Sequence, residues 1–288
     1  MNELNILDFL KKKIKLSSST IIGPGDDAAL LRNFKQEIVF CGDMLIEDVH
    51  FKLKDATFFD IGYKSVARTL SDIAAVSAVP KYIGISLALP KKYSSKIKEF
   101  LSGVEVLLKR FKIDLVGGDL SCSKKIFVDV WAIGFVEKNR FVKRSGAKPG
   151  DSIFVTGTLG GSYKGKHKKF LPLIEKSRKL TKEFKINSMM DISDGLAVDL
   201  YRILKESKVG AKIYQKQIPL SKDALTLEDG LYSGEDYELL FTANPKNKQK
   251  LIKKGFFYIG DIIKGKELLL CDDKKTKKLK TKGFVHFS

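Results

Sequence analysis

The chain is short of cysteine and histidine, and both shortages exclude kinds of site. Of its 288 residues, three are cysteines and three are histidines. Cys41, Cys122 and Cys271 are widely spaced and odd in number, so the sequence offers neither a disulfide framework nor a Cys-x-x-Cys zinc site. This usage fits a reducing compartment, and we expect a cytoplasmic protein.

Long apolar runs are also missing. No stretch approaches the roughly 18 apolar residues that a membrane-spanning helix needs, and residues 1–16 form an amphipathic Leu/Ile/Lys pattern without the apolar centre of a signal peptide. We therefore expect no membrane association. The hydrophobic content of 43% is enough to build the core of one large domain or of two ordinary ones.

Acidic residues are scarce beside basic ones, 34 against 53, which gives a net charge of +19. Such a charge favours binding to polyanions through counterion release. Only seven of the basic residues are arginine, however, and arginine is the residue suited to clamping phosphates and reading guanine. The lysine clusters at 11–13, 164–169 and 273–280 are expected at helix edges or in loops. We favour a solvated lysine-rich surface, keep anionic small substrates as an alternative, and consider nucleic acid an unlikely partner.

The usual phosphate-binding loops are absent. There is no G-x-x-x-x-G-K-[ST] sequence, residues 157–162 lack the G-x-G-x-x-G spacing, and no protein-kinase motif occurs. If ATP binds, metal ions and scattered backbone groups must hold its phosphates.

Strand-like and helix-like runs alternate, which predicts a mixed α/β or α+β architecture. Helices are predicted at 58–78, 94–111, 171–184 and 195–204. Strands are predicted at 38–41, 83–89, 114–116, 126–136, 152–156, 239–242, 259–263 and 267–271. The turn-rich stretch 144–151 predicts a division into an N-terminal domain, 1–143, and a C-terminal domain, 144–288.

Six aspartates stand at predicted strand ends, helix starts or Gly/Ser turns: Asp27, Asp43, Asp72, Asp119, Asp191 and Asp194. Each has an ordinary explanation, since Gly-Asp-Asp at 25–27 is common turn chemistry and Asp194 or Ser193 suits a helix cap. Their joint placement in a basic protein points instead to a shared cation site. Carboxylates without clustered His or Cys suit Mg²⁺, which usually also binds a substrate phosphate.

Seven motifs in order resemble the thiamine-monophosphate kinase family, within the superfamily of aminoimidazole ribonucleotide synthetase, selenophosphate synthetase and the hydrogenase maturation factor HypE. They are Gly25-Asp26-Asp27-Ala28-Ala29, Asp43 with His50-Phe51, Ser71-Asp72-Ile73-Ala74-Ala75, Gly117-Gly118-Asp119, the 144–151 stretch, Asp191-Ile192-Ser193-Asp194-Gly195-Leu196 and Gly234-Glu235-Asp236-Tyr237-Glu238-Leu239. The chain differs from the family in a shorter 161–191 segment, which carries Gly165-Lys166-His167-Lys168 of its own.

The resemblance implies an α+β, two-domain aminoimidazole ribonucleotide synthetase-like fold. The N-terminal domain would bind ATP and Mg²⁺ and would form a β-barrel across a homodimer, with an α+β domain following. By the same resemblance the six aspartates would be Mg²⁺ ligands, with Asp27, Asp72 and Arg144 acting in catalysis. Gly118, Asp119, Arg144 and Ser193 would contact ATP, and His50 and Glu235 would face the thiamine phosphate.

Three hypotheses follow. The first is ATP-dependent phosphorylation of thiamine monophosphate to the diphosphate by direct in-line transfer. The second is a related synthetase-type enzyme that acts on another small acceptor. The third is a non-enzymatic basic protein that binds polyanions.

Overall fold

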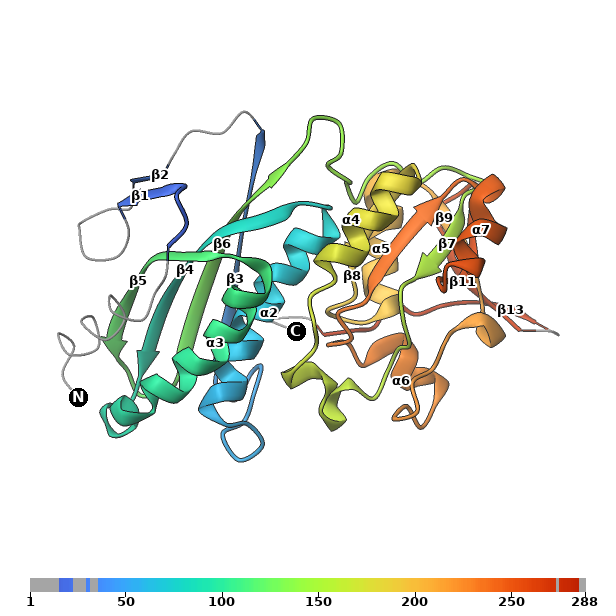
Figure 1. Ribbon diagram of the computed structural model, residues 1–288. Helices are drawn as coiled ribbons and strands as arrows, with labels where there is room; N and C mark the ends of the chain where they lie inside the picture. Colours follow the sequence, from blue (N-terminus) through green and yellow to red (C-terminus); the bar gives the residue numbers. More distant parts are fainter. Residues whose placement is uncertain (1–15, 23–29, 32–35, 273–274, 285–288) are drawn as a thin grey trace. The chain divides into compact units, whose positions relative to one another are not determined.

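The computed structural model describes residues 16–22, 30–31, 36–272 and 275–284, which form two compact units (Figure 1). The first unit contains residues 1–73, 78–139 and 168–172, and the second contains 74–77, 140–167 and 173–288. Two short segments, 74–77 and 168–172, therefore belong to a different unit from their neighbours in the sequence. The single boundary expected after residue 143 stays a prediction.

The first unit is a mixed sheet with helices on one face (Figure 1). Its strands are β1 (Thr20–Ile22), β2 (Leu30–Leu31), β3 (Glu37–Ile46), β4 (Val79–Leu89), β5 (Asp114–Cys122) and β6 (Phe127–Val136); its helices are α2 (Phe58–Ala75), the 3-10 turn η1 (Lys91–Lys96) and α3 (Ile97–Phe111). β1 and β2 pair as a separate hairpin, and the main sheet runs β3-β6-β4-β5. β4 and β5 are parallel, and the other neighbours are antiparallel.

The predicted apolar stripe of α2 is buried in the core of this unit. Ile61, Val66, Leu70 and Ile73 are each at most 1% exposed, and the last three follow the three-to-four residue spacing of a helix that packs one face against a sheet. Ser77, just beyond the helix, has a positive φ of 61°, which ends the helical path before β4 begins.

Two strands run further than the sequence predicted. β3 was expected to end at Cys41 but pairs with β6 from Glu37 to Ile46. β5 was expected to end at Val116 but continues beside β4 to Cys122. Continuous pairing satisfies the backbone N–H and C=O groups and outweighs the turn preference of the glycines. Asp43 and Asp119 consequently lie within strands and not after them.

The sheet face opposite the helices is apolar and open among the described residues. Ile38, Phe40 and Met44 of β3 are 67%, 68% and 48% exposed. The strand pairing places Phe40 opposite Ile133, and Gly42 opposite Trp131, on the same face. The Trp131 ring also covers Gly84 of β4, because a Cβ atom there would lie 2.0 Å from the ring.

The second unit is built on a mixed sheet in the order β13-β12-β9-β11-β7-β10-β8. Its strands are β7 (Ser152–Val155), β8 (Ile186–Asp191), β9 (Gly210–Tyr214), β10 (Leu239–Ala243), β11 (Phe257–Ile263), β12 (Leu268–Cys271) and β13 (Thr276–Lys278). Its α-helices are α4 (Ile174–Glu183), α5 (Leu196–Ser207), α6 (Leu227–Tyr232) and α7 (Lys248–Lys253), and its 3-10 turns are η2 (Ser162–Lys164), η4 (Gln215–Gln217) and η5 (Pro245–Asn247). A further 3-10 turn, η3 (Lys166–Lys168), ends in the first unit at Lys168.

The two faces of this sheet pack against different side chains. Ile153 and Val155 of β7 pack with Leu200 and Ile203 of α5 in the main core. Phe154, between them, points to the other face and stacks on Phe241 with ring centroids 5.3 Å apart. Residues 276–278, within the lysine cluster that was expected in a loop or at a helix edge, form β13.

Within the described ranges, no helix is long and apolar enough to cross a membrane.

Candidate active site

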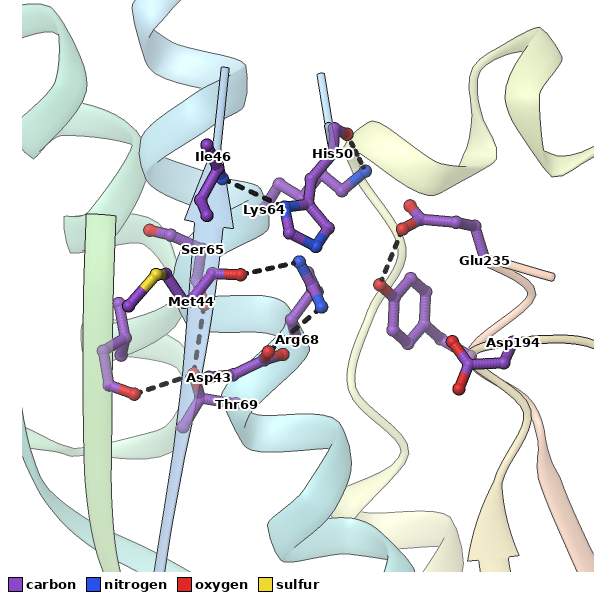
Figure 2. A network of polar contacts seen from close by, with 12 residues as sticks. Asp43, Met44, Ile46, His50, Lys64, Ser65, Arg68, Thr69, Asp194 and Glu235 are labelled. Carbon is purple, nitrogen blue, oxygen red and sulfur yellow. Dashed lines mark hydrogen bonds and ion pairs between the residues drawn. The ribbon is translucent and has the colours of Figure 1, made fainter. Parts of the chain in front are cut away.

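In the first unit, Asp43 is held where β3 passes α2 (Figure 2). Its carboxylate Oδ1 lies 3.0 Å from Nη2 of Arg68, and Nη1 of the same arginine donates to the carbonyl oxygen of Met44 at 3.1 Å. One guanidinium thus fixes both the side chain of Asp43 and the backbone that follows it. Arg68 was not predicted; its position four residues before Asp72, one helical turn away, was the available signal.

His50 is fixed through both its ring and its backbone (Figure 2). The ring Nδ1 accepts the backbone N–H of Ile46 at 3.0 Å. A ring nitrogen that accepts carries no proton, so the proton of the neutral imidazole is on Nε2. Lys64 is only 2% exposed and donates from Nζ to the carbonyl oxygen of His50 at 2.9 Å. The buried ammonium therefore supports the segment that carries the histidine.

The other predicted residues of this unit lie on α2 and β5. Asp72 is partly buried on α2, and Asp119 is exposed on β5. Gly118 has a φ of +154°, and a Cβ atom at this position would come within 1.9 Å of the carbonyl oxygen of Ile85. Glycine is therefore required for β5 to approach β4 just before Asp119. Asp27 lies outside the described residues.

In the second unit, Asp191 and Asp194 flank a turn between β8 and α5. Asp191 ends β8 and is 4% exposed. Asp194 Oδ2 lies 2.6 Å from Nη1 of Arg202. The same nitrogen is 2.6 Å from Oδ1 of Asp199, which is fully buried in the first turn of α5. Asp194, Asp199 and Arg202 therefore form one ion-paired group beside the end of β8, where Asp191 stands close enough to raise the pKa of Asp199.

The N-terminus of α5 is not capped by Ser193 or Asp194. The cap residue is Gly195, without a side-chain cap. Asp199 Oδ2 instead accepts the backbone N–H groups of Asp194 and Gly195 at 3.0 and 3.1 Å. Burial, together with the nearby carboxylates of Asp191 and Asp194, raises the pKa of Asp199 to about 7, and Arg202 opposes the rise.

The segment 234–238 joins this turn to the glycine-rich stretch after β7. The N–H of Glu235 donates to the carbonyl oxygen of Ser193 at 2.7 Å, and the N–H of Tyr237 donates to that of Ile192 at 2.8 Å. Glu235 and Tyr237 have positive φ values of 58° and 51°, a strained geometry for residues with side chains. Such strain persists only where surrounding contacts impose it.

Three carboxylates of this segment contact residues 156–167. Glu235 Oε2 lies 3.5 Å from Nδ1 of His167. Asp236, 1% exposed, accepts the N–H of Gly160 at 2.9 Å and the hydroxyl of Ser162. Burial raises the pKa of Asp236 to about 6, although these hydrogen bonds oppose the rise.

Glu238 completes this set of contacts. It accepts the hydroxyl of Thr156 at 2.7 Å and pairs with Nζ of Lys166 at 2.7 Å. Glu235, Asp236 and Glu238 thus all fix the glycine-rich stretch, while Glu235 also borders the turn of Asp191 and Asp194. The motif at 234–239 was recognised in the sequence, but its binding to residues 156–167 was not.

The predicted residues therefore fall into two groups, one in each unit. Asp43 and His50 lie in the first group, and Asp191, Ser193, Asp194 and Glu235 lie in the second. Arg144 is exposed in the second unit, where its carbonyl oxygen accepts the hydroxyl of Ser207 at 3.4 Å. Across the ranges that the structure describes, no three His, Cys, Asp or Glu side chains gather closely enough to hold a metal ion. The six-aspartate Mg²⁺ site stays a prediction.

Comparison with known proteins gives a consistent answer over almost the whole chain. Residues 25–136 match the family model of the AIR synthase related protein N-terminal domain, and residues 148–267 match that of its C-terminal domain. The thiamine-monophosphate kinase of Bacillus subtilis is 35% identical in an alignment that covers 100% of both chains. The chain belongs to the thiamine-monophosphate kinase family.

Solved structures agree with this family. A structure described as AaThiL complexed with AMPPCP and TMP is 30% identical, with a TM-score of 0.79 over 99% of this chain and 97% of that one. The hydrogenase maturation protein HypE superposes with a TM-score of 0.82 over 100% of this chain and 98% of its own, at 18% identity. HypE therefore shares the fold. The expected two-domain aminoimidazole ribonucleotide synthetase-like fold is confirmed.

Proposed function

We propose that this protein transfers the γ-phosphoryl group of ATP to thiamine monophosphate and so forms thiamine diphosphate. The observation that carries the proposal is the likeness to AaThiL, 30% identical over 99% of this chain and solved with AMPPCP and TMP. The transfer would be direct and in line, without a covalent enzyme intermediate.

The reaction brings two anionic phosphates together, and the protein must reduce their repulsion. We assign Mg²⁺ binding to Asp27, Asp43, Asp72, Asp119, Asp191 and Asp194. The donor set supports this assignment because it consists of carboxylate oxygens, the ligands that Mg²⁺ prefers. Bound Mg²⁺ would neutralise phosphate charge. Asp27 and Asp72 would take part in catalysis, and Arg144 would stabilise charge that develops in the transition state.

Substrate contacts would be divided between backbone and side chains. Gly118, Asp119, Arg144 and Ser193 would contact ATP. His50 and Glu235 would face the thiamine phosphate. Because Nδ1 of His50 accepts a backbone hydrogen bond, we propose that His50 acts as a neutral Nε2–H donor that orients the acceptor phosphate. The buried Lys64 would provide positive charge behind it.

We also propose a homodimer formed through the open face of the first unit's sheet, with the two sheets closing into a barrel. Large exposed apolar surfaces on a folded domain usually mark a contact site, and Ile38 and Phe40 are 67% and 68% exposed there. In sedimentation velocity, Phe40→Asp should convert the dimer to a monomer. Val106→Asp, which changes an exposed apolar residue of α3, should not. A dimeric Phe40→Asp variant would rule out this interface.

A cytoplasmic location is proposed as well. In support, the three cysteines, all within the described residues, form no disulfide.

The activity is tested with purified protein, Mg²⁺, ATP and thiamine monophosphate. We expect one thiamine diphosphate for each ADP formed. A folded sample that binds an ATP analogue yet forms no thiamine diphosphate would overturn the proposal. Release of inorganic phosphate with another acceptor would indicate the synthetase-type alternative.

A further inference from the structure

Asp199 is a buried carboxylate to which the predicted mechanism gives no task. It lies in the first turn of α5 and is 0% exposed. The helix positions beside it, Leu196, Leu200 and Ile203, belong to the apolar core. A carboxylate in such surroundings is costly unless hydrogen bonds and a counter-charge satisfy it. Its contacts therefore indicate what it does.

The two oxygens of Asp199 bind different partners, the turn of Asp194 and the side chain of Arg202. Oδ2 accepts the backbone N–H groups of Asp194 and Gly195 at 3.0 and 3.1 Å. Oδ1 accepts from Nη1 of Arg202 at 2.6 Å. The first pair of contacts fixes the backbone that carries Asp194.

Arg202 fixes the side chain of Asp194, in addition to the backbone that Asp199 fixes directly. Its Nη1 lies 2.6 Å from Oδ2 of Asp194 as well as 2.6 Å from Oδ1 of Asp199. The arginine is held in turn by the buried carboxylate, three residues before it on the same helix. Asp199 thus fixes Asp194 twice, directly through its N–H group and indirectly through Arg202.

We propose that Asp199 is a positioning residue that presents the carboxylate of Asp194 to the metal–nucleotide complex. The proposal rests on the proposed function in one respect, the assignment of Asp194 as a metal ligand. Residues that orient a metal ligand usually contribute about 10- to 100-fold to metal affinity. Asp199 itself need not touch metal or substrate.

The test measures Mn²⁺ binding in the presence of a non-hydrolysable ATP analogue, with free Mn²⁺ followed by electron paramagnetic resonance. We expect Asp199→Ala to weaken Mn²⁺ binding about 10- to 100-fold. Asp199→Asn should weaken it less, because its amide oxygen can still accept the two backbone N–H groups. Asp194→Asn should weaken it at least as much as Asp199→Ala.

Asp151→Asn is the matched control. Asp151 is 4% exposed, accepts the N–H of Lys148 at 2.8 Å and is bonded by Nδ2 of Asn187 at 2.8 and 2.9 Å. It is thus another buried carboxylate of the second unit that anchors a turn. This variant should lower the unfolding temperature and leave Mn²⁺ affinity unchanged.

Two results would overturn the proposal: unchanged affinity in Asp194→Asn, or a loss in Asp199→Ala no greater than in Asp151→Asn. If Asp199→Ala does not fold, Asp199→Asn decides, and unchanged affinity in it would count against the proposal. The binding measurement needs no acceptor. A protein that behaves as expected here but makes no thiamine diphosphate would overturn the proposed function and support the role of Asp199.

Discussion

The two groups of site residues hold the backbone with charges of opposite sign. In the first unit, the cations Arg68 and Lys64 donate to the carbonyl oxygens of Met44 and His50. In the second unit, the carboxylates of Asp199 and Asp236 accept backbone N–H groups. Each charge is matched to the backbone group it binds, and hydrogen bonds to charged groups are the stronger kind. In both units, a charged side chain fixes the backbone beside a predicted site residue.

The largest expected effect tests whether the two groups serve one reaction. Asp43→Asn and Asp191→Asn should each lower kcat by about 10²- to 10³-fold, the usual loss when one charge-stabilising group is removed. Steady-state kinetics at saturating ATP and Mg²⁺ would measure it. If one variant lost activity fully and the other kept the kcat of the wild type, a single unit would carry the chemistry.

The next effect is a pH dependence of stability that comes from Asp236 in the second unit. The pKa of Asp236 rises from its ordinary 3.8 to about 6, so folding takes up a proton between these values. Its contribution to stability is therefore fully present below pH 3.8 and is lost as pH rises through about 6. The difference corresponds to at most about 3 kcal/mol. Urea unfolding at a series of pH values should show wild type losing stability relative to Asp236→Asn over this window; parallel curves would contradict it.

A third effect compares the two kinds of buried charge directly. Lys64→Met leaves the carbonyl oxygen of His50 without its donor, and Asp236→Ala leaves the N–H of Gly160 without its acceptor. Each should lower the free energy of unfolding by about 1–3 kcal/mol. Asp119→Ala, at an exposed position, should change it by less than about 0.5 kcal/mol. If Lys64→Met left the free energy of unfolding unchanged, only the carboxylates would anchor the backbone.

The smallest effect concerns the shape of one cation. Arg68 reaches Asp43 and Met44 with two different nitrogens, which the single ammonium of lysine cannot reproduce. Arg68→Lys should cost about 0.5–1.5 kcal/mol, the worth of one hydrogen bond, in chemical denaturation. If Arg68→Lys lowered the free energy of unfolding as much as Lys64→Met does, the two-nitrogen geometry of the guanidinium would matter more than its charge.

Much of the fold follows from the sequence because local patterns and tertiary packing agree there. The apolar spacing of α2 and the alternation in β6 predicted both elements closely. β3 and β5 were cut short because Gly42 and Gly117 are turn formers in isolation. Pairing with β6 and β4 decided their length, and such long-range pairing has no local signal.

The site shows the same limit. The family motifs identified Asp191, Asp194 and Glu235, but not what holds them. Asp199 and Arg202 are one helical turn apart and look like an ordinary surface pair in the sequence. Only the packing of α5 shows that Asp199 is fully buried. The contact between Glu235 and His167 joins residues 68 positions apart, so no spacing rule predicted it.

Trp131 is the chain's only tryptophan, and its ring lies on Gly84 in the open face of the first unit's sheet. The indole is therefore a built-in optical probe of that face. If a second copy covers the face, diluting the protein should shift the intrinsic emission to longer wavelength as water reaches the ring. The same sample would then report assembly without any added label.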